Sequence, residues 1–259
     1  MNNDMERVIY KKNPLIEVIL QVRFPTILTI NSNDPVEFQE AIRKYYPIYR
    51  LGIEREQELA FIAKENSFFP SLQEKSQRKN HEFVSADGEY KVNLTSSFIS
   101  ISTVKYTRWE EFFEKFKFIL SCFVEIYQPA FYERIGLRYI DAFSREKLNI
   151  PDKSWKDLIH SPWIGPLSNI NEGDLINLGI DSEYLLDNKR SLIKIHTGLG
   201  VLNNTEKVFI VDSDFIHPLT VALEEYENIA EYLHDNSGKF IRSVITDTLH
   251  EAMEPGELK

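Results

Sequence analysis

The sequence predicts an α+β fold with a largely antiparallel sheet, long helices packed on one face of it, and two similar halves. Three observations lead to this prediction. Segments with strand character follow one another through short turns, helical segments are few and widely spaced, and each half of the chain places its strands before a long helix. Strands joined by tight turns pair antiparallel, whereas a parallel sheet needs a helical crossover between successive strands. We therefore expect helices that cover an antiparallel sheet.

The first strand is expected at 13–24, NPLIEVILQVRF. Its apolar side chains from Ile16 to Phe24 alternate with a more polar set, which is typical of a strand with one buried face. A helix is expected over 33–47, with Asp34 as its N-cap and a proline at the first helical position. The chain thus begins with a strand followed by a short helix.

More strands are expected after this helix. A short one is predicted at 58–65, whereas residues 66–80 are mostly polar and rich in turn formers and are predicted to be a surface loop. Three strands are expected within 81–106, because an Asp-Gly pair at 87–88 and the Thr-Ser-Ser sequence at 95–97 mark two reversals of the chain. Most strands of the first half therefore lie in this region.

The strongest helix prediction spans 107–129. Thr107 and Glu110 have the spacing of a capping box, and a proline ends the segment. A stripe of apolar side chains favours a helix that lies across a sheet over a cofactor slot, because burying each large side chain stabilises the fold by ~1.5–3 kcal/mol. The stripe consists of Trp109, Phe112, Phe113, Phe116, Ile119, Leu120, Phe123 and Val124.

The chain divides near a segment with several prolines and glycines and two tryptophans. We predict an N-terminal α+β half at 1–145, a connector at 146–170 and a C-terminal α+β half at 171–259. The halves are either separate domains or one compact unit, and the sequence leaves both possibilities open. The strand that closes the first half is expected within 129–143. In the second half we expect strands at 173–186, 190–202 and 206–215, followed by helices at 217–237 and 238–253.

Composition restricts the class of protein. The net charge of −10 opposes binding to nucleic acid, which relies on Lys and Arg displacing counterions from phosphates. The single cysteine, Cys122, cannot form an internal disulfide, and its apolar helical context predicts a small buried side chain. The N-terminus lacks the apolar core of a signal peptide, and no apolar run approaches the ~20 residues of a membrane helix. We therefore expect a cytoplasmic protein that does not enter the membrane.

Several segments are similar to the hallmarks of a bacterial family. They are the Pro-aliphatic-Glu-Val opening at Pro14 to Val18, the helix start with Tyr106, Trp109 and Phe112, the Arg-aliphatic-Gly-aliphatic-Arg-Tyr strand at Arg134 to Tyr139, and the strand VDSDF before a helix. Over nearly its whole length the chain resembles a sporadically distributed, uncharacterised family. The resemblance implies no established activity and no catalytic residues. The patchy distribution of the family implies carriage on mobile or defence-type gene islands.

The strand ERIGLRYIDAF carries the best candidate for a binding site. Arg134, Gly136 and Arg138 share one face, and the glycine leaves backbone exposed between two arginines. The favoured interpretation is a cross-strand ionic ladder in which Glu17 or Glu133 pairs with an arginine. The other interpretation is a polar face whose arginine forks hold an anion or a partner segment. The candidate binding residues are Arg134, Arg138, Gly136, Tyr139, Arg23 and Glu17.

A candidate metal site lies in FIVDSDFIH. On an alternating strand Asp212 and Asp214 point the same way, and two carboxylates on one face suit Mg²⁺ or Mn²⁺, with His217 just beyond them. Paired aspartates at a strand end serve nucleases and nucleotidyl transferases. The favoured alternative is a solvated strand end before a helix, where acidic side chains meet the positive end of the helix dipole.

The sequence contains no Walker loop, GxGxxG, GxSxG, HExxH or EF-hand pattern, and its six histidines are scattered. It therefore predicts a non-catalytic recognition or accessory protein without a cofactor, which binds an anionic ligand or a protein partner encoded nearby. The alternative is a metal-dependent hydrolase or nuclease built on Asp212 and Asp214 with Mg²⁺ or Mn²⁺. A homo-oligomer is compatible with either function.

Overall fold

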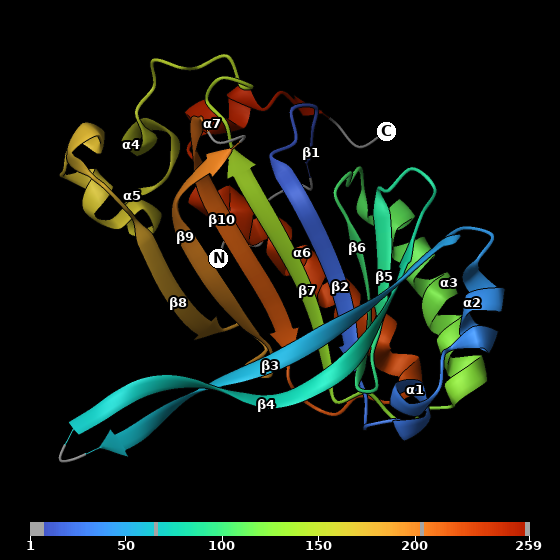
Figure 1. Cartoon of the computed structure of the whole chain (residues 1–259). Helices are drawn as coiled ribbons and strands as arrows, with labels where there is room; N and C mark the ends of the chain where they lie inside the picture. The colour runs from blue at the N-terminus through green and yellow to red at the C-terminus, as the bar shows by residue number, and fades with distance from the viewer. Residues whose placement is uncertain (1–7, 65–66, 203–204, 257–259) are drawn as a thin grey trace.

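The computed structural model describes residues 8–64, 67–202 and 205–256, and over 54–64 and 67–77 it describes the backbone alone. Nine strands form one open antiparallel sheet in the order β3-β4-β5-β6-β2-β7-β10-β9-β8, and β1 pairs with β11 in a small separate ribbon. Figure 1 shows the large sheet crossing the molecule, with α6 behind its central strands. The predicted α+β class with an antiparallel sheet is therefore confirmed.

The strands are β1 (Ile9–Tyr10), β2 (Leu15–Arg23), β3 (Ile48–Lys64), β4 (Ser67–Val84), β5 (Tyr90–Leu94), β6 (Phe98–Thr103), β7 (Arg134–Phe143), β8 (Gly179–Leu185), β9 (Leu192–Leu202), β10 (Glu206–His217) and β11 (Pro255–Gly256). The α-helices are α1 (Leu28–Ser32), α2 (Val36–Ile42), α3 (Trp109–Tyr127), α4 (Trp155–Leu158), α5 (Ser161–Ile164), α6 (Tyr226–Val244) and α7 (Asp247–Ala252). Short 3-10 helices are η1 (Gly165–Ser168), η2 (Glu172–Asp174) and η3 (Leu223–Glu225).

The two halves of the chain share one topology around the central β2–β7 pair (Figure 1). Each half begins at a central strand, passes through short helices to the far edge of the sheet, and returns strand by strand until its last strand pairs with its first. A helix of 19 residues then follows, α3 in the first half and α6 in the second. The similarity of the halves therefore lies in the path of the chain.

One core serves both halves. Strand β7 pairs with β2 on one side and with β10 on the other, so the sheet is continuous between them. The predicted connector, 146–170, contributes Trp155, Leu158, Ile164 and Leu167 to the same cluster of buried side chains. That segment therefore packs as a part of the core.

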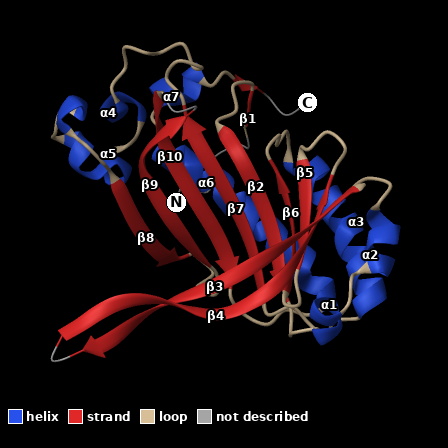
Figure 2. Ribbon diagram, in the orientation of Figure 1, coloured by secondary structure: helices blue, strands red, loops and turns tan. Residues whose placement is uncertain are grey.

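The face of the sheet that meets α6 is apolar. Helix α6 contacts β7 and β10, and Figure 2 shows it behind these strands. Leu20 on β2, Leu137 on β7 and Phe215 on β10 are cross-strand neighbours on this face, and all three are fully buried. We call it the inner face and the opposite one the open face.

The aromatic stripe of α3 is buried, as predicted, with only Val124 partly exposed. Cys122 is half-buried and packs at the edge of the core. Figure 1 shows α3 beside β5 and β6, and α3 also contacts α2. No helix within the described ranges is long and apolar enough to cross a membrane.

Two predicted helix caps are wrong. The N-cap of α3 is Arg108, and the hydroxyl of Thr107 donates to Glu111 at 2.8 Å, so no capping box forms with Glu110. Helix α2 begins one residue later than predicted, so that Pro35 takes the cap position in place of Asp34. In both places the cap residue lacks a side-chain hydrogen bond to the helix. Packing of the apolar helix faces therefore fixes where these helices start.

The predicted surface loop at 66–80 is wrong over 67–80, because β4 runs through these residues and pairs with β3 along almost its whole length, while residue 66 lies outside the described residues. In Figure 1 this pair forms a long twisted ribbon that extends beyond the rest of the sheet. Two antiparallel strands satisfy each other's backbone groups without an apolar face, so the absence of alternation did not signal irregular structure.

The C-terminal helices also differ from the prediction. Strand β10 continues to His217, and one helix, α6, then passes through Gly238, where the sequence suggested a break. A glycine inside a helix costs about 1 kcal/mol, which tertiary packing of the flanking turns outweighs. The chain becomes extended at Ile245, and α7 follows with Thr246 as its N-cap.

Candidate functional site

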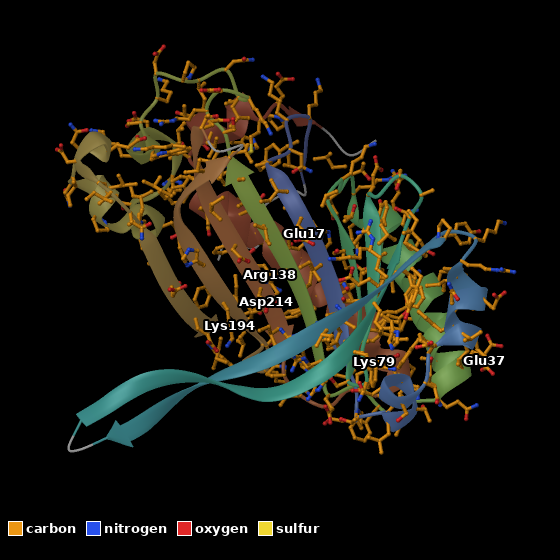
Figure 3. All side chains as sticks on the ribbon, viewed as in Figure 1. Glu17, Glu37, Lys79, Arg138, Lys194 and Asp214 are labelled. Carbon is orange, nitrogen blue, oxygen red and sulfur yellow. The ribbon has the colours of Figure 1, made fainter. Side chains whose placement is uncertain are left out.

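The two predicted arginines lie on the open face and pair with the two predicted aspartates. Figure 3 shows Arg138 and Asp214 on this face of the sheet. Arg138 makes a bidentate contact to Asp212, with Nε donating to Oδ1 at 2.7 Å and Nη2 donating to Oδ2. Arg134 donates from Nη2 to Asp214 Oδ2 at 3.0 Å and from Nη1 to Gln21 Oε1 at 2.9 Å. The face therefore carries a cross-strand ionic ladder between β7 and β10.

The acids of this ladder differ from the predicted ones. Glu17 or Glu133 was expected to pair with an arginine, whereas Asp212 and Asp214 do so. A β-bulge interrupts the register before Glu17, which then stands opposite Ile140 on β7. Its negative charge contributes to raising the pKa of the Arg138 guanidinium, after the larger effect of the hydrogen bond to Asp212.

Gly136 has a definite role in the ladder. A Cβ at this position would lie 2.8 Å from Nη1 of Arg134 and 2.9 Å from Nη2. The missing side chain therefore lets the arginine lie flat along β7 and reach both Gln21 and Asp214. The space that the sequence suggested for a ligand or a bulge is filled by the guanidinium of the same strand.

The candidate metal ligands are only partly brought together. Asp212 and Asp214 share the open face, as the alternation predicted, but each already forms an ion pair with an arginine. His217 lies on the inner face, where it is 2% exposed and its Nδ1 is hydrogen-bonded to Ser191 Oγ at 2.9 Å. Its place beside the aspartates was thus wrongly predicted, because an odd step along a strand reverses the face. Among the described residues no three His, Cys, Asp or Glu side chains cluster to hold a metal ion.

The remaining predicted residue of the open face is Arg23. It is exposed, stands opposite Arg134 across the β2–β7 pair, and donates from Nε to Gln21 at 3.3 Å. A hollow of about 420 Å³ opens on the same face near Arg138 and His196. Since charges of both signs line it, the hollow has no single electrostatic preference.

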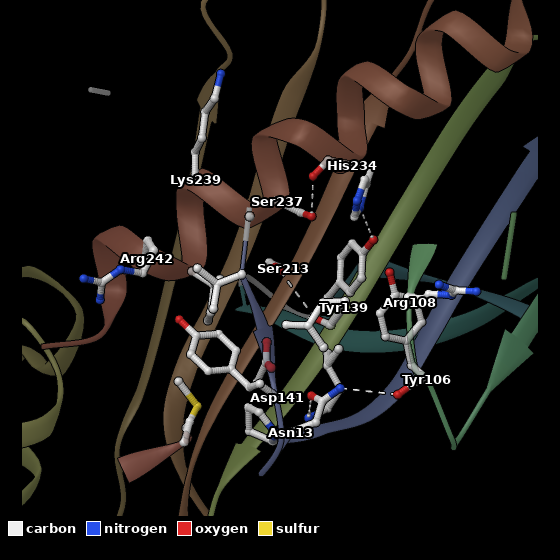
Figure 4. A pocket seen from close by; sticks show the side chains of 18 of the residues that line it. Asn13, Tyr106, Arg108, Tyr139, Asp141, Ser213, His234, Ser237, Lys239 and Arg242 are labelled. Carbon is white, nitrogen blue, oxygen red and sulfur yellow. Dashed lines mark hydrogen bonds between the residues drawn. The ribbon is translucent and has the colours of Figure 1, made fainter. Parts of the chain in front are cut away.

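A second cavity, of about 220 Å³, lies on the inner side of the sheet (Figure 4). Its walls come from β1, the start of β2, the segment before α3, strands β7 and β10, and helix α6. The pairing of β1 with β11 brings the N-terminal segment over this site, although the two strands are far apart in the sequence. Tyr139 is the only residue of the predicted set that lines it.

The most unusual side chain in this pocket is Asp141. It lies on the inner face of β7, opposite Val211 of β10, and is 5% exposed. Burial, followed by the negative charge of Asp212 across the sheet, raises the pKa of its carboxyl to about 8. Within the described residues, this carboxyl has no hydrogen bond or ion pair from another side chain. A buried polar group of this kind is costly unless something satisfies it.

The backbone beside Asp141 is irregular. The bulge in β2 sets Leu15 opposite Asp141 and Glu17 opposite Ile140, so Ile16 becomes the additional residue. Ile16 was predicted to share the buried face but is 39% exposed. Bulges frequently re-aim strands next to functional sites, and this one lies at the floor of the pocket.

Aromatic side chains build the pocket walls and are held in place by histidines. The hydroxyl of Tyr139 is hydrogen-bonded to Nδ1 of His234 at 2.9 Å, and that imidazole stacks on Trp109 with 4.4 Å between ring centroids. On the opposite side the hydroxyl of Tyr10 is hydrogen-bonded to Nδ1 of His250 at 2.8 Å. Burial raises the pKa of Tyr10 to about 12, so the phenol stays protonated.

The serine hydroxyls and the two arginines around the pocket are engaged elsewhere. Ser237 Oγ donates to the backbone oxygen of His234 at 2.7 Å, and Ser213 Oγ donates to that of Tyr139 at 3.4 Å. At the rim, Arg242 pairs with Asp247 at 3.0 Å and Arg108 pairs with Glu111 at 2.9 Å. Among the described residues that line the pocket, Asp141 is thus a buried acidic group without a partner side chain.

The sequence contained a signal for Asp141. If Arg134, Gly136 and Arg138 share the open face, then Asp141 falls on the inner face with Leu137. A carboxylate at a buried position of an alternating strand is a candidate functional residue, because burial perturbs its pKa. The pattern of arginines on the same strand instead indicated a candidate site on the open face.

No protein-family model matches the chain, and no curated protein is significantly similar to it. The resemblance to the sporadically distributed family therefore stays a prediction.

Proposed function

We propose that this chain is a non-catalytic recognition protein that holds a small ligand in the pocket over Asp141. The observation that supports the proposal is Asp141, which is 5% exposed, lines a cavity, and has a carboxyl group that is not paired within the described residues. No side chain of the described residues donates a hydrogen bond to this carboxyl, and burial disfavours its charged form. A ligand that donates to the carboxyl would supply the missing partner.

The surrounding groups favour binding over covalent chemistry. A nucleophilic serine is activated by a base within hydrogen-bonding distance. Ser213 and Ser237 instead donate to backbone carbonyl oxygens, and Nδ1 of His234 is hydrogen-bonded to Tyr139. The pocket thus combines fixed aromatic walls with a buried carboxyl that no described side chain pairs with, and apolar walls with few polar groups are typical of a ligand-binding site.

The open face supports recognition less well. An anion held by Arg134 and Arg138 would have to displace Asp212 and Asp214 from the guanidinium groups. A metal ion held by the aspartates would have to displace the arginines, without help from His217 on the other face. Both hypotheses begin with the loss of an existing ion pair.

Gly238 offers a test of the pocket. It lines the cavity from α6, and a Cβ built there meets no heavy atom within 4 Å. We expect Gly238→Phe to fold and to place its ring over the pocket mouth, whereas Gly238→Ala serves as the matched control. Both variants and the wild type are incubated with a small-molecule extract of the host, washed and denatured, and the released compounds are identified by mass spectrometry.

A compound that the wild type and Gly238→Ala retain, and that Gly238→Phe retains at least tenfold less, supports the proposal. Equal retention by all three proteins, or no retained compound, contradicts it. The broader proposal also includes a cytoplasmic location and a protein partner encoded nearby. A pull-down from the host that recovers no stoichiometric partner would remove that part and leave the pocket untouched.

A further inference from the structure

We propose that the ligand of this pocket is a small molecule with a protonated amine, and that its ammonium group pairs with Asp141. This inference rests on the proposed function, because it names the class of ligand for the same site. It follows from the charge, the walls and the size of the cavity.

The charge distribution favours binding of a cation at the bottom of the pocket. Asp141 is buried, whereas Asp235, the other carboxylate of the lining, is exposed at the rim. Asp212 is close enough to raise the pKa of Asp141 but lies across the sheet, where Arg138 neutralises it. An ammonium group donates up to three hydrogen bonds and cancels the buried charge.

The walls suit the same group. Tyr10, Tyr106 and Tyr139 all line the cavity, and the ring of Tyr106 meets that of Tyr139 edge to face at 5.9 Å. The faces of aromatic rings attract ammonium groups through their quadrupole, most strongly where water is excluded. Figure 4 shows Tyr106, Tyr139 and Asp141 converging on the cavity.

The basic side chains near the mouth do not reverse this preference. Arg242 is neutralised by Asp247, and Arg108 by Glu111. Lys239 is the further cation of the lining, and it projects from α6 at the rim, away from Asp141 in Figure 4. A volume of about 220 Å³ is below the range of drug-sized pockets, which favours a small free amine over a segment of a partner protein.

Binding of an amine should release a proton. The polar groups that line the pocket around Asp141 are Tyr10 from β1, Tyr139 on its own strand, Ser213 from β10, and His234 and Arg242 from α6, with Lys239 at the rim and Asp212 behind the sheet. With a pKa of about 8, the carboxyl of the free protein is mostly protonated at pH 7. The ammonium group pairs with the ionised form, so affinity should rise with pH towards about 8, by at most about tenfold per pH unit.

The test uses isothermal titration calorimetry with three probes of one shape: benzylamine, benzyl alcohol and benzoate. For the wild type we expect benzylamine to bind at least tenfold more tightly than the other two. Its enthalpy at pH 7 should depend on the ionisation enthalpy of the buffer, because a proton is released. In Asp141→Asn the preference for the amine should disappear, whereas Asp235→Asn, which removes the rim carboxylate, should keep it.

The outcomes separate this inference from the proposed function. If benzyl alcohol or benzoate binds with the same affinity as benzylamine, and Gly238→Phe abolishes that binding, the pocket is a binding site but the proposed preference for an amine is overturned. Binding of a lysine-containing peptide without binding of benzylamine would assign the pocket to a protein side chain and also overturn it. If none of the probes binds and Gly238→Phe retains the same host compounds as the wild type, both proposals fail. Thermal melts of Asp141→Asn show whether the variant is folded in each case.

Discussion

Asp141 and Asp212 stand on opposite faces of the sheet, one residue apart in the ladder between β7 and β10. Arg138 neutralises Asp212 on the open face, whereas no side chain of the described residues pairs with Asp141 on the inner face. Burial and the neighbouring negative charge together raise the pKa of Asp141 to about 8. The β7–β10 pair thus carries one carboxyl group in an ion pair, that of Asp212, and one without a partner among the described side chains, that of Asp141.

The first prediction concerns pH and stability. The carboxyl of Asp141 has a pKa of about 8 in the folded protein and ~3.9 in the unfolded chain, so the folded state binds the extra proton between these values. Its contribution to the free energy of unfolding is therefore largest below about pH 4 and falls as pH rises to 8, by at most about 1.4 kcal/mol per unit. Asparagine does not titrate, so Asp141→Asn should gain stability relative to the wild type over this window.

The measurement is the difference in melting temperature between Asp141→Asn and the wild type from pH 5 to 9. It should grow with pH and level off above about 8. Asp235→Asn, which changes an exposed carboxylate of the same pocket, should show no such trend. A constant difference for Asp141→Asn would mean that the buried carboxyl titrates normally.

The second prediction compares the two rungs of the ladder. The side chain of Arg138 is 44% exposed, so Arg138→Ala should cost about 1 kcal/mol or less. Arg134 and Asp214 are both more than 70% buried, and burial already raises the pKa of that aspartate, so Arg134→Ala should cost about 1–3 kcal/mol. Urea denaturation of the two variants tests the order. Equal costs would contradict the different burial of the rungs.

The third prediction concerns Gly136 and the guanidinium group of Arg134 that lies over it. Gly136→Ala should push the guanidinium of Arg134 away from Asp214 and Gln21, because the new Cβ would approach it to 2.8 Å. The single change should cost about 1–3 kcal/mol. In the Arg134→Ala background the same change should be neutral or slightly stabilising, since alanine then meets no guanidinium. A double-mutant cycle that shows additivity would exclude the steric coupling.

The fourth prediction concerns the aromatic stripe of α3. Phe116 is fully buried, so Phe116→Ala should lower the free energy of unfolding by ~3–5 kcal/mol. Phe118 lies on the same helix but is 37% exposed, and Phe118→Ala is the matched control with a smaller expected cost. An unchanged melting temperature for Phe116→Ala would show that this side chain is not part of a packed core.

Much of the architecture was predictable because it depends on local periodicity. The alternation around Leu20 and Leu137 places these side chains on the buried face of strands. The 3.6-residue stripe of α3 identifies its buried face, and a left-handed Gly88 (φ 75°) forms the turn that the Asp-Gly pair indicated. The shared faces of Arg134 with Arg138, and of Asp212 with Asp214, follow from the same period of two.

What the sequence alone determined is therefore the class of each segment and the face on which each side chain lies. Only the tertiary structure decided which faces meet. The sequence could not show that β7 and β10 are neighbours, so the arginines and the aspartates appeared as two separate candidate sites. The pocket over Asp141 depends on β1, β7 and α6, which are distant in the chain. It also depends on a bulge in β2 that the alternation of apolar and polar residues does not reveal. Local periodicity specifies orientation, whereas pairing between distant segments depends on the burial of the whole core.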